Sequence, residues 1–132
     1  MYPFYIHVAF MGTGLILMAA GVFVVRFLRK KHWWLKFHRS VGITGVMCLG
    51  TGVVAAVVMV SQGGSGHFRV PHTWLGMTAV LFAIVTPVLG HLQFKIRSQI
   101  QQLRRWHRRI GYTSLLLVMS TVLSGLAVAG YI

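Results

Sequence analysis

Four long stretches of this chain contain no Lys, Arg, Asp or Glu, and they limit what it can fold into. The sequence has 132 residues, with 13 Lys and Arg and no Asp or Glu. A bilayer-spanning helix needs about 20 consecutive apolar residues, and the uncharged stretches are 1–25, 40–68, 70–94 and 110–132. We therefore predict an all-α integral membrane protein, a four-helix bundle that forms one domain over 1–132. The predicted helices span about 5–27, 36–61, 71–93 and 103–129.

The basic residues are gathered in the segments between these stretches. Six lie between the first and second stretches, six between the third and fourth, and one, Arg69, in the remaining segment. Cytoplasmic loops of membrane proteins carry an excess of Lys and Arg, so we expect both basic loops in the cytoplasm and both termini on the other side. Because the charge flanks membrane segments, we expect membrane lipid rather than nucleic acid as its partner.

A short pattern recurs near the start of each predicted helix: a histidine, with small residues one and two turns further on. Residues at i, i+4 and i+7 lie close to one helix face, so the small residues leave a groove beneath each ring. A ring nitrogen above a shallow groove suits a flat, wide ligand such as haem. The copies are His7 with Gly14, His38 with Gly42 and Gly45, His72 with Gly76, and His107 with Gly111.

The alternating direction of the helices sorts these histidines into two levels. His7 and His72 begin helices at the outer side, and His38 and His107 begin helices at the inner side. If helices one and three lie diagonally opposite, as do two and four, each pair can hold one iron axially. We therefore predict two haems, an outer one on His7 and His72 and an inner one on His38 and His107.

A second set of small residues follows the histidines at a distance of fourteen positions. These residues are expected to leave room for the haem of the other pair, and they are Gly21, Gly52, Thr86 and Thr121. His91 and His32 are the alternative inner ligands. His107 is favoured over His91 because it has a glycine at i+4 and His91 lies near the end of its helix, but the sequence leaves this choice open.

These motifs resemble those of the cytochrome b561 family. The first core helix of that family typically reads His-Pro-x-Leu-Met-x-x-Gly, and the segment from His7 to Gly14 keeps His7, Met11 and Gly14 of this motif, with Val8 in place of proline. The third core helix reads His-Ser-Trp-Leu-Gly, and His72-Thr-Trp-Leu-Gly76 is similar. The resemblance implies two b-type haems and electron transfer across a membrane. Many members add a helix at each end, and the small core here favours a bacterial inner membrane.

Two functions are open at this point. The first is a haem-bearing subunit that exchanges electrons with a larger redox protein, such as a multihaem c-type cytochrome. The second is a stand-alone transmembrane reductase of ferric iron or another small acceptor, fed by ascorbate or a quinol. The short termini and loops leave little chain for a substrate pocket, which favours the subunit. Basic residues near the inner pair are candidates for holding haem propionates, namely Arg104, Arg105, Arg108 and Lys36.

Overall fold

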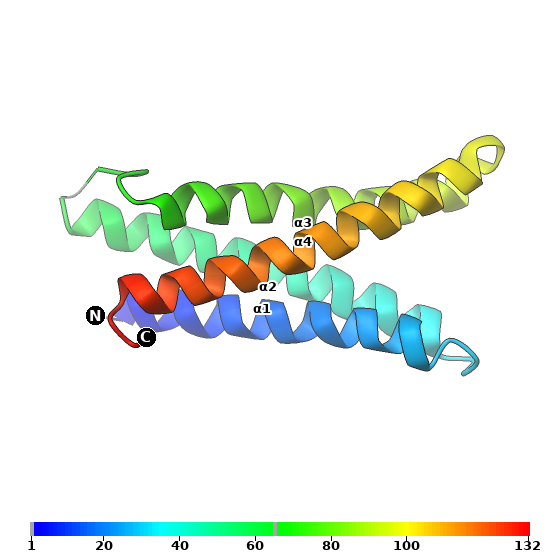
Figure 1. Ribbon diagram of the computed structural model, residues 1–132, viewed down its shortest axis with the longest axis horizontal. Helices are drawn as coiled ribbons and strands as arrows, with labels where there is room; N and C mark the ends of the chain where they lie inside the picture. The colour runs from blue at the N-terminus through cyan, green and yellow to red at the C-terminus, as the bar shows by residue number, and fades with distance from the viewer. Residues whose placement is uncertain (1, 65) are drawn as a thin grey trace. The chain divides into compact units, whose positions relative to one another are not determined.

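Four long helices make up most of the chain, as predicted. The computed structural model describes residues 2–64 and 66–132, and all four helices are long and apolar enough to cross a membrane. They are α1 (Tyr2–Phe27), α2 (Trp34–Gln62), α3 (Pro71–Lys95) and α4 (Ile100–Val128), with a short 3-10 helix, η1 (Arg97–Gln99), before α4 (Figure 1). The prediction of an all-helical chain with four apolar helices is therefore confirmed.

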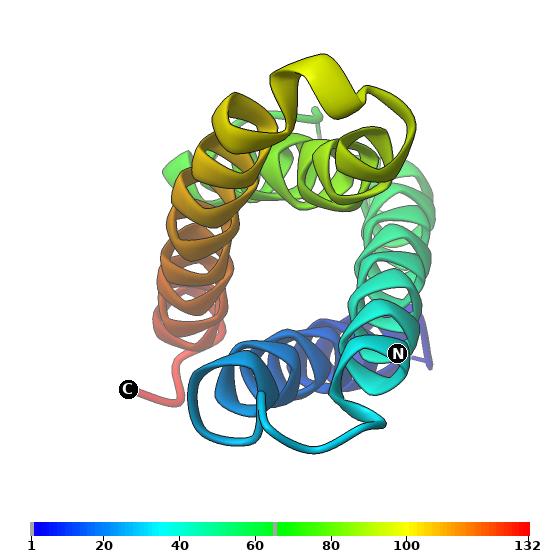
Figure 2. The ribbon, with the colours of Figure 1, turned by 90° about the vertical axis from the view of Figure 1, so that its right-hand side faces the viewer.

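The chain forms two compact units. The N-terminal unit (Met1–Trp74) contains α1, α2 and the first four residues of α3, and the C-terminal unit (Leu75–Ile132) contains the rest of α3, η1 and α4. In the N-terminal unit, α1 and α2 lie side by side and are joined by a short loop, 28–33 (Figures 1 and 2). Backbone hydrogen bonds from Lys31 to Leu28 (2.9 Å) and from Trp34 to Lys31 (3.2 Å) reverse the chain in this loop.

α3 and α4 both extend further into the basic segment between them than the predicted bounds of 93 and 103. α3 continues to Lys95 and α4 already begins at Ile100, so 96–99 alone connects the two helices. The first two turns of α4 are rich in Gln and Arg, which are good helix formers. A sharp change from apolar to charged residues therefore marks the edge of an apolar segment but does not mark the end of a helix.

Glycines bring α1 and α2 to backbone contact. A Cβ added at Gly14 would lie 2.7 Å from Leu49 Cδ2 and 3.1 Å from the Gly45 carbonyl oxygen. Leu49 is fully buried. Membrane helices commonly approach closely through small residues, so Gly14 and Gly45 serve first to pack these two helices.

The outer surface of the helices is apolar. Large aliphatic side chains are among the most exposed, including Ile16 (70%) and Met47 (68%). In water such a surface would drive association, whereas in a bilayer it faces lipid chains. The length, the composition and this exposed apolar surface agree in describing an integral membrane protein.

Candidate haem-binding histidines

Burial divides the seven histidines into two groups. The four predicted ligands, His7, His38, His72 and His107, are each partly buried in the helices. The other three, His32, His67 and His91, are exposed. An axial ligand must lie partly inside the protein to face a bound cofactor, so this division favours the four predicted histidines over His91 and His32.

Backbone carbonyls of neighbouring helices orient the rings of His7, His38 and His107. The Nδ1 atoms of His7, His38 and His107 lie 2.8, 3.1 and 2.8 Å from the carbonyl oxygens of Gly52, Gly21 and Thr86. A carbonyl oxygen only accepts hydrogen bonds, so Nδ1–H is the donor, and in the neutral ring the lone pair is then on Nε2. Metal-ligating histidines characteristically donate their other N–H in this way.

The three acceptors all belong to the second set of small residues noted in the sequence. His7 donates to the carbonyl of Gly52, which lies fourteen residues after His38. His38 donates to the carbonyl of Gly21, which lies fourteen residues after His7. A Cβ at Gly21 would lie 3.4 Å from His38 Nδ1. Small residues at these positions thus admit a histidine ring to the backbone, a role that the sequence analysis had missed because sequence alone does not say which helices are neighbours.

His7 and His72 lie close together in the N-terminal unit. Their ring centroids are 6.2 Å apart and their planes are inclined at 89°. An imidazole nitrogen binds a metal at about 2 Å and the ring centre lies about 1.1 Å further back, so two imidazoles sharing one ion have centroids about 6 Å apart. The observed separation matches this value, and it also matches an edge-to-face contact between two rings. The inner pair, His38 and His107, stays a prediction.

Two histidines do not by themselves complete the coordination of a metal ion. Within residues 2–64 and 66–132, no three or more His, Cys, Asp or Glu side chains gather into a group that could hold one. A metal held by His7 and His72 would therefore need further ligands. A porphyrin supplies four nitrogen ligands in a plane, so haem fits this donor set.

The other glycines predicted to line the haem differ in their surroundings. A Cβ at Gly76 would lie 3.3 Å from Thr121 Cγ2, and one at Gly111 would lie 3.4 Å from Thr86 Cγ2. A Cβ at Gly42 would meet no atom within 4 Å. Gly76 and Gly111 therefore contact the neighbouring helix. Of the five glycines predicted to line the haems, Gly42 alone borders open space.

Gly90 is a neighbour of His107 that the sequence analysis had not singled out. A Cβ at this position would lie 3.1 Å from His107 Cε1 and 3.3 Å from Nδ1. The ring of His107 therefore rests against the backbone of α3 at Gly90, close to its acceptor Thr86. Gly90 is not part of the histidine-and-glycine pattern, so only the packing of α3 on α4 reveals it.

The four basic residues predicted to hold propionates are not equally placed. Each residue turns an α-helix by about 100°, so Arg104 lies about 60° and Arg108 about 100° from His107 around α4. Arg105 lies about 160° from His107, and Lys36 lies about 160° from His38 on α2. All four are exposed. Arg104 is thus the one nearest the side of its histidine, and Arg105 and Lys36 lie on nearly opposite sides.

Apolar membrane helices with partly buried, carbonyl-oriented histidines define a class, the helical membrane haem proteins. Within that class, the chain belongs to the cytochrome b561 family, because the family model described as eukaryotic cytochrome b561 matches residues 6–131. The comparison with curated proteins finds no match, and neither does the comparison with solved structures. The resemblance drawn from the His7 and His72 motifs is confirmed, and the family binds b-type haem and transfers electrons across membranes.

Proposed function

We propose that this protein transfers electrons across a membrane through two b-type haems. His7 and His72 would hold the outer haem, and His38 and His107 the inner one. The observation that carries the proposal is the set of Nδ1 hydrogen bonds to Gly52, Gly21 and Thr86, because metal-ligating histidines typically donate one ring N–H to a backbone carbonyl and bind the metal through the other nitrogen. The 6.2 Å separation of His7 and His72 supports the outer pair.

Bound b-type haem supplies reversible one-electron chemistry at its iron. The residues of the chain hold and orient that group. The carbonyls of Gly21, Gly52 and Thr86 fix the tautomer and direction of three rings, and fully buried apolar residues such as Leu49 and Val118 exclude water between the helices. The chain contains no Asp or Glu, so its side chains offer no carboxylate to relay protons.

Electron transfer across a bilayer is tested with the holoprotein in sealed vesicles. Ferricyanide is trapped inside, and the impermeant reductant dithionite is added outside. We expect the trapped ferricyanide to be reduced with the wild-type protein and to stay oxidised with His72→Ala. Equal reduction with and without the protein in the vesicle membrane would contradict the proposal.

We further propose that the chain is a haem-bearing subunit of a larger respiratory complex in a bacterial inner membrane. The loops support this, since 28–33, 63–70 and 96–99 leave few residues for a substrate pocket. The partner would be a redox protein, such as a multihaem c-type cytochrome. Purification in mild detergent should recover the chain together with a second redox protein, in a fixed ratio.

One observation favours the alternative, a stand-alone reductase. A hollow of about 390 Å³ lies where α3 turns into α4 and is lined by Gln93, Phe94, Arg97 and Ile100. Ligand pockets have volumes of about 300–1,000 Å³ and combine apolar walls with a few polar groups, so a quinol or ascorbate would fit this description. The purified protein would then be reduced by such a donor, and Arg97→Ala would slow that reduction.

A further inference from the structure

α4 has two unlike sides. Its buried side includes Ser114, Val118 and Thr121, which are at most 1% exposed. Two residues along a helix correspond to about 200° around it, so Leu116 lies opposite Ser114. The row of exposed residues on this opposite side is here called the α4 stripe, and it consists of Arg105, Arg108, Tyr112, Leu116, Met119 and Leu123.

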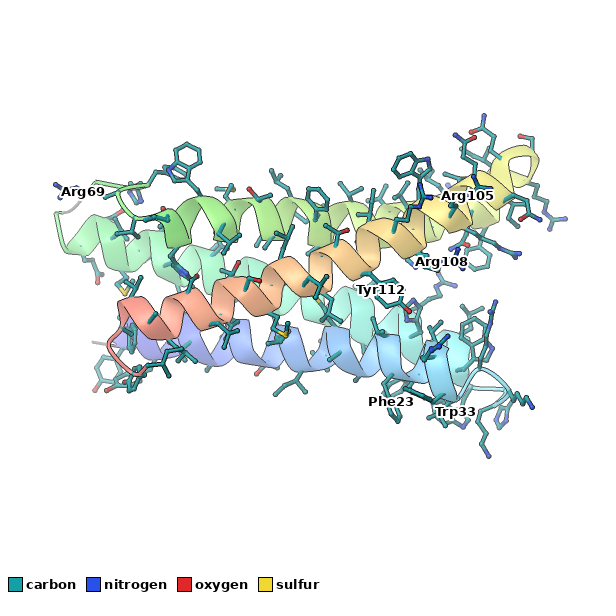
Figure 3. The ribbon with its side chains drawn as sticks, in the orientation of Figure 1. Phe23, Trp33, Arg69, Arg105, Arg108 and Tyr112 are labelled. Carbon is teal, nitrogen blue, oxygen red and sulfur yellow. The ribbon has the colours of Figure 1, made fainter. Side chains whose placement is uncertain are left out.

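The α4 stripe changes in character along the helix. Its spacings of three and four residues form one straight row, and Figure 3 shows Arg105, Arg108 and Tyr112 following one another along α4. On the C-terminal side of Tyr112 (47% exposed), the row is apolar and ends at Leu123 (51% exposed). Tyr112 and Leu123 are eleven residues apart, or about 16 Å, close to the roughly 15 Å thickness of one hydrocarbon leaflet.

An anion that pairs with the arginines of the stripe has to come from outside the chain. The chain has no Asp or Glu side chain with which they can pair, and no acidic residue lies in the first turn of α4. Arg105 and Arg109, four residues apart, also repel each other. A bound anion would pair with these charges and relieve the repulsion.

We propose that the α4 stripe binds an anionic phospholipid lengthwise. Its phosphate would lie on the guanidinium groups of Arg105 and Arg108, its glycerol esters beside the Tyr112 hydroxyl, and an acyl chain along Leu116 and Leu123. Arginine suits this task because its planar group donates two parallel hydrogen bonds to a phosphate. Tyrosine is typical of the depth between headgroups and acyl chains.

A second copy of the chain is a poorer occupant of this surface. In a symmetric dimer, a helix packs against the same helix of its partner. Two copies in one membrane orientation would bring arginine against arginine, and no carboxylate side chain exists in either copy to separate them. A lipid phosphate brings the opposite charge at the required depth.

The proposal is tested with the holoprotein in phosphatidylcholine bilayers that contain trace spin-labelled phosphatidylglycerol or phosphatidylcholine. The immobilised fraction of each label gives their relative association constants. Each cation near a membrane surface contributes about fivefold to the attraction of anionic lipid. We therefore expect wild type to prefer phosphatidylglycerol severalfold and R105Q/R108Q to lose most of that preference. Tyr112→Phe should lose a smaller part.

The matched control is K30Q/K31Q, which removes the same charge from a loop predicted to lie at the same membrane face. It should retain most of the preference for phosphatidylglycerol. An equal loss in K30Q/K31Q would overturn the proposal, because general surface charge would then account for the preference. No preference in the wild type would overturn it as well. If R105Q/R108Q does not fold, R105K/R108K keeps the charge without the planar group and should show a partial loss; an unchanged preference there would contradict the role of arginine.

A photoreactive residue in place of Leu116 separates lipid from a partner helix. Benzoylphenylalanine at this position, activated by light in intact cells, should crosslink to lipid and leave the protein band without a large shift in mass. A crosslink to another protein chain at the same position would overturn the proposal, because the stripe would then be covered by protein.

Discussion

At the scale of single residues, one hydrogen bond determines which nitrogen of a histidine meets a metal. The backbone carbonyls that accept from Nδ1 of His7, His38 and His107 place the ring lone pair on Nε2, the nitrogen that we propose binds iron. Exposure separates these rings from His91 and His32, which the sequence had left as alternatives. The sequence predicts histidine ligands from residue type and spacing, whereas the contacts that orient these rings come from neighbouring helices and are visible only in the fold.

Replacing one histidine of each predicted pair should remove one haem at a time. His72→Ala should lose the outer haem and keep the inner one, and His107→Ala should do the reverse, because each iron would lose one of its two axial ligands. The haem content per chain and the reduced-minus-oxidised spectrum measure this. His91→Ala is the control and should keep the wild-type haem content. Loss of a haem in His91→Ala would show that His91 is an iron ligand in place of one of the predicted histidines.

Gly90→Ala tests the contact that holds the ring of His107. The added methyl would lie 3.1 Å from Cε1, closer than ordinary contact, so the ring must shift and its hydrogen bond to Thr86 lengthen. Changes around a metal ligand typically weaken binding by about tenfold or more. We expect faster loss of the inner haem to an apoprotein acceptor. Gly50→Ala, with no atom within 4 Å of its added Cβ, should behave like wild type.

At the scale of helices, glycine has two roles that the sequence does not distinguish. The pattern behind each histidine was interpreted as a groove for haem, yet Gly14 and Gly45 pack α1 against α2, and Gly76 faces Thr121. A small residue serves a helix contact and a cofactor contact equally well. The positions of the helices were predictable because they depend on apolar length alone, whereas the partner of each glycine depends on which helices pack together.

Gly14→Ala should destabilise the N-terminal unit. Its methyl would lie 2.7 Å from Leu49 Cδ2 and 3.1 Å from the Gly45 carbonyl, and overpacking of this kind costs about 1–3 kcal/mol. The midpoint temperature of haem release in detergent should fall. Gly12→Ala is the matched control two residues away, where an added Cβ meets nothing within 4 Å, and it should be as stable as wild type or slightly more stable. Equal effects of both variants would argue against a close contact at Gly14.

At the scale of the whole molecule, charge determines orientation in the membrane. The basic residues are confined to the segments 26–39 and 95–109, apart from Arg69, and we propose that both segments face the cytoplasm. A Cys48→Ser background removes the one native cysteine. In that background, an impermeant maleimide added to intact cells should label Gln62→Cys and spare Lys31→Cys. The reverse pattern would place the basic loops on the outside.

The number of haems per chain tests the central claim most directly, since two histidine pairs require two irons. A pyridine haemochrome assay of the purified wild-type protein, set against its amino-acid analysis, measures this number. We predict two b-type haems per chain, falling to one in His72→Ala. One haem or none in the wild type, or two haems retained in His72→Ala, would contradict the assignment.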